Sequence, residues 1–241
     1  MSSSDRSSGS SGKNINLPSH IGYIVDGNRR WAKANGLASL QGHKRGFEVL
    51  RDISIASIEA GVQYVSAFCF STENWNRSKT EVSYLMKLIV KLLNENINDM
   101  ADRNIRIVHV GARDGLPKSV LVAIDKAVAK TADCTKGTLA LCINYGGQQE
   151  IVDATKKLLR QRPDPVRLTI DDFSKALYTP YIPDIDLVVR TSGEYRTSGF
   201  MLWRTAYAEY SFVDKCWPDF TKQDLKLVLL DYARRHRRFG K

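Results

Sequence analysis

The sequence predicts an α/β protein with a central, mostly parallel, six-stranded sheet flanked by helices. Short apolar runs alternate with longer helical patterns along most of the chain, which is typical of parallel strands joined by helical crossovers. The runs are almost continuously apolar, as expected for strands that are buried on both faces. With 241 residues, of which 43% are hydrophobic and 26% charged, the chain is long enough for one domain with a substantial core.

Each element follows from its local pattern. Strands are expected at residues 22–25, 64–70, 106–110, 139–143, 187–190 and 210–213. Long helices are expected at residues 44–60, 82–102, 118–131, 149–160 and 223–238, and shorter ones at 170–177 and 200–207. Helix-start signals support these assignments; Thr221 and Asp224, for example, have capping-box spacing before the last helix.

Residues 1–13 are rich in Ser and Gly and predict a flexible leader or an expression remnant, so we expect residues 14–241 to form a single domain. No run approaches the roughly 18 apolar residues that a bilayer-spanning helix needs, and no secretory signal is present. A cytoplasmic protein, at most peripheral at the membrane, is therefore expected. The four cysteines lack C-x-x-C spacing, so we expect free thiols and no zinc site.

The formal net charge of +10 indicates an acidic partner. Part of the excess is local, because the tail at residues 234–241 carries five basic residues and no acid. Phosphorylated substrates, anionic lipid surfaces and nucleic acid are all compatible with this charge.

The segment at residues 21–31, I-G-Y-I-V-D-G-N-R-R-W, is the most informative part of the chain. A strand, a tight turn and a helix start would put backbone N–H groups and the positive end of a helix dipole beside Arg29 and Arg30, which predicts a phosphate site. Asp26 adds an anionic oxygen, which suits a divalent cation holding a diphosphate. Alternatively, Asp26 simply caps the following helix, since Asp is a favoured N-cap.

Ligands of open parallel sheets bind beyond the carboxyl ends of the strands. In this chain, those positions are rich in arginines, amides and small residues, at 26–30, 71–77, 144–147 and 190–196. Their convergence on one edge predicts an enzyme that handles phosphate esters. The chain has neither a G-x-G-x-x-G segment after a strand nor a P-loop, which argues against a dinucleotide enzyme or a P-loop NTPase.

Seven motifs together resemble the cis-prenyltransferases, the undecaprenyl diphosphate synthase family. They are D-G-N-R-R-W-A at 26–32, G-H-K-R-G at 42–46, F-S-T-E-N-W-N-R at 70–77, N-Y-G-G at 144–147, R-T-S-G-E-x-R at 190–196, W-x-x-A-Y-A-E at 203–209 and W-P-D-F at 217–220. The resemblance implies a homodimer with a hydrophobic tunnel in each subunit. It also implies Mg²⁺-dependent condensation of isopentenyl diphosphate with an allylic prenyl diphosphate, which forms a Z-configured polyprenyl diphosphate.

The resemblance assigns roles to individual residues. Those implied to be catalytic are Asp26 and Asn74, and those implied to hold Mg²⁺ are Asp26 and Glu209. The residues implied to bind the allylic diphosphate are Gly27, Asn28, Arg29, Arg30, Trp31, His43, Ser71, Trp75 and Arg77. Those implied to bind isopentenyl diphosphate are Arg190, Arg196, Ser198, Arg238 and Gly240, the last two reaching the neighbouring subunit's site. Without the resemblance, His43 fits a solvated helix start and Glu209 a solvated carboxylate on a surface helix or its end.

An apolar stripe recurs at helical spacing between residues 82 and 100. Core packing explains most such stripes, but in this family the equivalent helix also lines the tunnel, so that the sizes of its residues would limit the length of the product. Three positions depart from the family pattern: Ser39, Tyr195 and Gly199. They bear on metal and substrate preference rather than on the class of reaction.

Two other functions are compatible with parts of the sequence. A nucleic-acid-binding protein would explain the net charge and the basic tail, but would gain nothing from Asp26 and Glu209, and we expect no nucleic-acid partner. An inactive accessory subunit of a two-component prenyltransferase would be expected to lack the D-G-N-R or the R-x-G element, and this chain has both. The isolated Asp171–Asp172 pair argues against a trans-type prenyltransferase. A lipid product would make a transient membrane contact reasonable.

Overall fold

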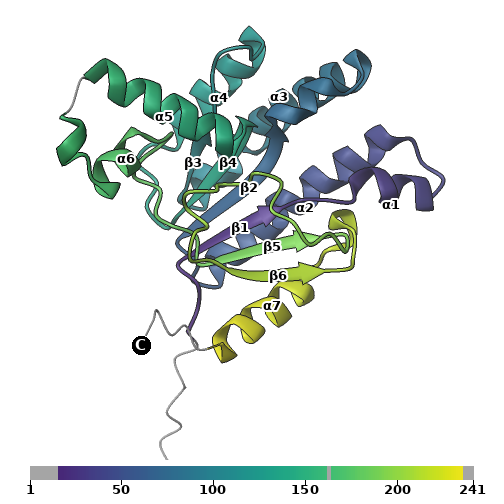
Figure 1. Ribbon diagram of the computed structural model, residues 1–241. Helices are drawn as coiled ribbons and strands as arrows, with labels where there is room; N and C mark the ends of the chain where they lie inside the picture. Colours follow the sequence, from purple (N-terminus) through teal and green to yellow (C-terminus); the bar gives the residue numbers. More distant parts are fainter. Residues whose placement is uncertain (1–15, 162–163, 236–241) are drawn as a thin grey trace, which may run out of the picture.

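The computed structural model describes residues 16–161 and 164–235 (Figure 1). It contains one six-stranded sheet with the strand order β3-β4-β2-β1-β5-β6, in which every pair of neighbouring strands is parallel. The strands are β1 (His20–Ile24), β2 (Tyr64–Ser71), β3 (Ile105–Val110), β4 (Gly137–Tyr145), β5 (Leu187–Thr191) and β6 (Glu209–Val213). The predicted fold class is confirmed, and all six expected strands are present.

The expected long helices are also present. They are α2 (Ser39–Glu59), α3 (Lys79–Asp102), α4 (Lys118–Lys130), α5 (Gly147–Gln161) and α7 (Lys222–Arg234), with the shorter α1 (Asn28–Ala34) and α6 (Ile170–Ala176). Helix α2 begins five residues before the expected start. Helix α7 begins with the predicted capping box of Thr221 and Asp224, and it ends at Arg234 because Arg235 has an extended backbone. The last part of that predicted helix, residues 236–238, lies outside the described residues.

The short helix expected at residues 200–207 is wrong. This segment forms a series of turns, and Met201 has a φ of 41°, which a right-handed helix does not allow. Its apolar residues were read as a helical face, but Phe200 and Met201 are instead fully buried against the sheet together with Ile185 and Val188. Tertiary packing therefore overrides the local pattern.

The two faces of the sheet are covered differently, because alternate side chains of each strand point to opposite sides. Ile21 and Tyr23 of β1 point into the larger core, which is completed by α2, α3, α4 and α7. The other face packs against the segment at 178–210, while α5 and α6 pack on each other (Figure 1). Across residues 16–161 and 164–235, none of the helices combines the length and the apolar character that crossing a bilayer requires.

Candidate active site

A polar cavity opens at the carboxyl edge of the sheet, where the sequence predicted that the segments following the strands would meet. Its volume is about 860 Å³, part of which is open to solvent. The residues that line it are Ile24, Val25, Asp26, Asn28, His43, Gly46, Phe47, Leu50, Phe68, Cys69, Ser71, Asn74, Arg77, Leu85, Arg190 and Ser198. Eight of the residues that the resemblance assigned to substrates, catalysis or metal are therefore brought together at one site.

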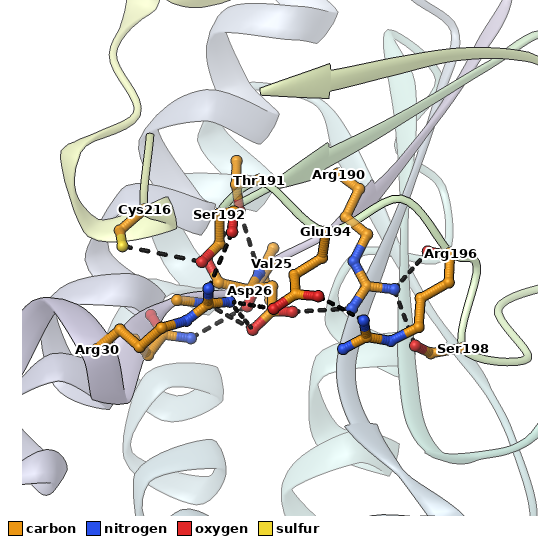
Figure 2. Close-up of polar contacts among 12 residues, drawn as sticks. Val25, Asp26, Arg30, Arg190, Thr191, Ser192, Glu194, Arg196, Ser198 and Cys216 are labelled. Carbon is orange, nitrogen blue, oxygen red and sulfur yellow. Dashed lines mark hydrogen bonds and ion pairs between the residues drawn. The ribbon is translucent and has the colours of Figure 1, made fainter. Parts of the chain in front are cut away.

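Asp26 lies just beyond β1, and its carboxylate faces the residues that follow β5 (Figure 2). Oδ1 accepts a hydrogen bond from the Gly27 N–H at 2.7 Å, and Oδ2 accepts one from Arg190 Nη2 at 2.8 Å. The N-cap of α1 is Gly27, with a φ of 98° and no side-chain capping bond. The alternative in which Asp26 simply caps the helix is therefore wrong. The Asp26 side chain is 33% exposed, so a ligand can reach it.

Arg190, the fourth residue of β5, ties Asp26 to the loop that follows the strand. Its side chain is only 3% exposed, and Nη1 donates to Ser198 Oγ at 2.8 Å and to the backbone oxygen of Arg196. Its Nε is buried without a hydrogen-bond partner among the described residues. A buried guanidinium with one unsatisfied N–H is suited to donate a hydrogen bond to a further anionic oxygen.

Arg30 and Glu194 complete this side of the site (Figure 2). Arg30 Nη2 lies 3.6 Å from Asp26 Oδ1 and 3.1 Å from Glu194 Oε1, so one guanidinium bridges two carboxylates. Glu194 also accepts a hydrogen bond from Arg196. Sequence reasoning quoted Glu194 within the R-T-S-G-E-x-R motif but gave it no role. Its place in the loop after β5 was the signal that could have identified it.

A second basic cluster lies on α2 and at the start of α3. Glu81 Oε1 accepts hydrogen bonds from Arg77 Nη1 at 2.9 Å and from His43 Nε2 at 3.2 Å. Burial lowers the pKa of His43 below its ordinary value, and the neighbouring Arg77 lowers it further, so that at neutral pH the ring is uncharged. Burial alone would raise the pKa of Glu81, but the charge of Arg77 and the bond from His43 hold it below the ordinary value. His43 is therefore a buried polar residue rather than a solvated helix start.

Sequence reasoning used Glu81 only as a capping signal. Ser78 does cap α3 by accepting a bond from the Glu81 N–H, but the Glu81 carboxylate is used by the basic cluster. Its position four residues after Arg77, one helical turn away, was the signal available.

Ser71 and Asn74 hold each other at the cavity wall. Ser71 ends β2 and Asn74 lies in the 3₁₀ helix η1 (Thr72–Asn76), and the two form a reciprocal capping box, with the Ser71 N–H donating to Asn74 Oδ1 at 3.1 Å. The arrangement fixes the direction of η1 as it leaves the sheet.

Two predicted substrate residues use their indole N–H groups elsewhere. Trp31 donates to Asp219 Oδ1 at 2.7 Å, and Trp75 donates to Asn144 Oδ1 at 2.7 Å. Neither is among the residues that line the polar cavity. Arg29 lines a second, more open recess outside the polar cavity, together with Arg30, Lys33, Ser39 and Arg77. This outer recess meets the polar cavity at Asp26, Asn28 and His43, which line both.

Glu209 does not lie beside Asp26 within one chain. It is the first residue of β6, not part of a surface helix, and it pairs with Leu187, which in turn pairs with Ile21. Asp26 lies five residues beyond Ile21, roughly 16 Å along the strand direction at about 3.3 Å per residue. The Glu209 carboxylate instead binds Arg235 Nη1 at 3.0 Å, at the opposite edge of the sheet.

The remaining predicted residues lie away from Asp26 or outside the described chain. Arg238 and Gly240 fall outside the described residues. Tyr195 is 71% exposed, and its ring packs 5.1 Å from that of Phe212 on β6. Gly199 has a φ of 77°, a conformation that glycine adopts without strain.

The glycines of the G-H-K-R-G motif let α1 lie directly on α2. A Cβ at Gly42 would lie 2.1 Å from the backbone oxygen of Asn28, and a Cβ at Gly46 would lie 2.0 Å from Asn28 Oδ1. Both distances are far below van der Waals contact, so only glycine fits. This close approach places the start of α1 beside His43 at the cavity.

An apolar cavity of about 520 Å³, part of which is open to solvent, adjoins the polar one, where the resemblance implied a tunnel. It lies between the sheet and helices α2 and α3, and is lined by Phe47, Leu50, Arg51, Cys69, Ile89, Leu92, Leu93, Asn96, Met100, Ile107, Leu139, Leu141 and Ile143. Phe47, Leu50 and Cys69 line both cavities and form the neck between them. Four members of the predicted α3 stripe, Ile89, Leu92, Leu93 and Met100, are part of this wall.

No group of three or more His, Cys, Asp or Glu residues that could hold a metal occurs within residues 16–161 and 164–235. Asp26 alone still fits Mg²⁺ in one common arrangement, in which one carboxylate joins substrate phosphate oxygens and water. The site can therefore receive anions through its basic groups and an apolar chain through the neck behind them.

Comparisons with known proteins agree with this geometry. A family model described as "Putative undecaprenyl diphosphate synthase" matches residues 24–240. An isoprenyl transferase of Thermotoga maritima is 42% identical over 228 residues, which cover 94% of this chain and 98% of that protein. Isoprenyl transferase 2 of Corynebacterium glutamicum is 46% identical, with 93% and 94% covered. The solved structure of lavandulyl diphosphate synthase from Lavandula x intermedia, in complex with dimethylallyl diphosphate, matches with a TM-score of 0.90 at 30% identity, covering 93% of this chain and 99% of that one. The chain belongs to the undecaprenyl diphosphate synthase family and is a cis-prenyltransferase that makes polyprenyl diphosphate.

Proposed function

We propose that the enzyme condenses isopentenyl diphosphate with an allylic prenyl diphosphate in a Mg²⁺-dependent reaction that forms a new Z double bond. The observation that carries this proposal is the position of Asp26. Its carboxylate lies between two clusters of basic side chains, in a polar cavity that adjoins an apolar one. Residues 14–241 would act as one catalytic domain.

The allylic diphosphate would bind at the His43 and Arg77 cluster and in the outer recess beside it, with its hydrocarbon passing the neck. Arg29, Arg30 and the start of α1 extend the same basic surface. Ionisation breaks the bond between C1 and its oxygen, and the charge that develops on the departing diphosphate needs donors already in place. The complex of lavandulyl diphosphate synthase with dimethylallyl diphosphate supports an allylic diphosphate as the ligand of this fold.

Isopentenyl diphosphate would bind on the other side of Asp26, at Arg190, Arg196 and Ser198. Its C4 then forms a bond to C1 of the allylic partner, and a proton leaves C2, for which an oxygen of the released diphosphate is a suitable acceptor. Ser71 would join the allylic diphosphate site, and Asn74, fixed beside it in their capping box, would act on the allylic substrate.

Mg²⁺, when bound, would offset the negative charge of the diphosphates. Asp26 would hold the ion together with phosphate oxygens, an arrangement that Mg²⁺ commonly adopts. Asp26 also pairs with Arg190 at 2.8 Å, so its orientation is set before any ligand arrives.

We also propose a cytoplasmic homodimer with transient membrane contact. Strand β6 is the outer strand of the sheet and exposes aromatic side chains, with Phe212 37% and the neighbouring Tyr207 78% exposed. Because Glu209 cannot reach Asp26 in its own chain, it would contribute to a metal site only from a second copy. Arg238 and Gly240 would likewise act in the neighbouring subunit's site.

Purified protein incubated with radiolabelled isopentenyl diphosphate and each primer from C5 to C20 tests the proposal. Labelled, primer-dependent polyprenyl diphosphate, lost on adding EDTA and restored by Mg²⁺, is expected. Absence of product with every primer, or undiminished product in EDTA, would contradict it.

A further inference from the structure

The N-Y-G-G segment, residues 144–147, contacts both loops that carry the proposed substrate residues. It joins the end of β4 to the start of α5 and is placed at the carboxyl edge of the sheet. None of its four residues lines the polar cavity, and the proposed reaction gives them no task.

The first contact is with η1. Trp75 Nε1 donates to Asn144 Oδ1 at 2.7 Å, and Asn144 Nδ2 in turn donates to the backbone oxygens of Ala112 and Asp114 at 3.0 and 2.9 Å. Asn144 is 5% exposed with a φ of 53°, so its side chain is held in one position. Two residues on, a Cβ at Gly146 would lie 2.4 Å from Thr72 Oγ1, so η1 rests directly on the backbone of Gly146.

The second contact is with the loop after β5. The Gly147 N–H donates to the backbone oxygen of Gly199 at 2.9 Å, and a Cβ at Gly147 would lie 2.4 Å from that same oxygen. Gly199 follows Ser198, whose hydroxyl accepts the hydrogen bond from Arg190. The loop that presents Arg196 and Ser198 is therefore supported by Gly147.

The segment is itself rigidly held. Between the two contacts, the Tyr145 hydroxyl donates to Glu150, a fully buried carboxylate that also pairs with Arg204 at 2.9 Å. A fixed support that touches each loop through a different residue can set the distance between the two loops.

We propose that residues 144–147 position the two diphosphate subsites relative to each other, with Gly146 controlling the allylic side and Gly147 the isopentenyl side. The inference rests on the proposed function. It makes these glycines positioning residues, since each acts through a loop and not on the substrate. The same Gly→Ala change should then raise KM for the allylic diphosphate at Gly146 and KM for isopentenyl diphosphate at Gly147.

The test compares Gly146→Ala with Gly147→Ala by steady-state kinetics, with each substrate varied in turn. Gly146→Ala should raise KM for the allylic diphosphate at least about fivefold and leave KM for isopentenyl diphosphate within about twofold, and Gly147→Ala should do the reverse. Thr72→Ala, which removes the Oγ1 atom that a Cβ at Gly146 would meet, should be near wild type alone and should restore Gly146→Ala. Circular dichroism checks that each variant is folded.

If Gly146→Ala or Gly147→Ala fails to fold, Asn144→Gly and Gly199→Ala replace them. Glycine tolerates the φ of Asn144 while releasing Trp75, and alanine at Gly199 strains the loop that Gly147 supports. Equal changes in both KM values, a loss confined to kcat, or no change would overturn the inference while leaving the proposed function intact. A wild-type protein that makes no product would overturn both.

Discussion

Two arginine–carboxylate pairs show how a structural ion pair differs from a functional one. Arg204 and Glu150 are 3% and 1% exposed, and Arg190 and Asp26 are 3% and 33% exposed. Glu150 also accepts bonds from Tyr145 and the Tyr178 N–H, so its oxygens are fully used. The remaining Arg204 donors go to backbone oxygens, including that of Ile182 at 3.3 Å.

In the pair of Asp26 and Arg190, by contrast, some polar atoms have no partner or face solvent. Part of its carboxylate faces solvent, Arg190 Nε has no partner among the described residues, and Arg30 shares its guanidinium with Glu194. Groups that are fully satisfied hold a fold together, whereas groups with spare donors and solvent access can exchange partners with a ligand. The comparison predicts that the Arg204 pair controls stability and the Asp26 pair controls turnover.

Glu150→Ala should have the largest effect on stability. It leaves the buried Arg204 guanidinium without its counter-charge, and the free energy of unfolding should fall by about 3–5 kcal/mol. Urea unfolding followed by circular dichroism measures this. The matched control is Glu48→Ala, whose pair with Arg45 is exposed and should contribute less than about 1 kcal/mol. Equal losses in the two variants would show that Glu150 has no special structural role.

His20 is another buried group whose polar atoms all have partners, and the pH dependence of stability tests its structural role. Its ring bonds the Pro183 oxygen and Ser66 Oγ, and burial lowers its pKa from 6.5 to about 4. Between these pH values the unfolded chain binds a proton that the native protein excludes, so stability should fall by about 3 kcal/mol as the pH drops from 6.5 to 4. In the His20→Gln variant, the free energy of unfolding should depend less on pH over the same range. The same slope in both proteins would contradict the assignment.

Arg77→Ala should affect binding instead of folding. Removing a charged donor from the allylic cluster should raise KM for the allylic diphosphate by roughly 10- to 100-fold, equivalent to about 1.5–3 kcal/mol. Initial rates over a range of primer concentrations measure this. Arg113→Ala, which breaks an exposed pair with Asp125, is the control and should leave KM unchanged. A normal KM in Arg77→Ala would place the allylic diphosphate elsewhere.

Phe47→Ala should have the smallest effect on turnover and a visible effect on the length of the product. Among the described residues, Phe47 is the one aromatic side chain that lines both the polar and the apolar cavity. Its removal frees roughly the volume of a phenyl ring, and products about one isoprene unit longer are expected. Thin-layer sizing of labelled products measures this, with Leu159→Ala, an exposed apolar residue on α5 that lines neither cavity, as control. An unchanged product distribution would show that the neck does not limit chain length.

Much of the fold could be predicted because buried parallel strands are nearly continuous apolar runs. The meeting of Asp26, Arg190 and Ser198 was predictable for a related reason, since the ends of parallel strands share one edge of the sheet. The turns at 200–207 were not predictable, because the left-handed Met201 is imposed by burial of Phe200 and not by local preference.

The ion-pair partners of the acidic residues could not be predicted either. Glu194 and Glu81 bind residues brought near them by packing or by one helical turn, and nothing in their residue type distinguishes them from solvated acids. A strand was predicted one residue after Glu209, but only the register of β6 shows that Glu209 lies at the edge of the sheet opposite Asp26.

Turnover by Asp26→Asn, measured alongside its free energy of unfolding, tests the central claim most directly. The amide preserves size, and its oxygen can still accept the bond from Arg190, but its NH₂ group loses the bond from the Gly27 N–H, so the free energy of unfolding should fall by about 1–3 kcal/mol and the protein should stay folded. Formation of labelled polyprenyl diphosphate should fall by at least about a hundredfold, because the carboxylate at the junction of the two basic clusters is lost. A folded Asp26→Asn protein with near wild-type turnover would contradict the account.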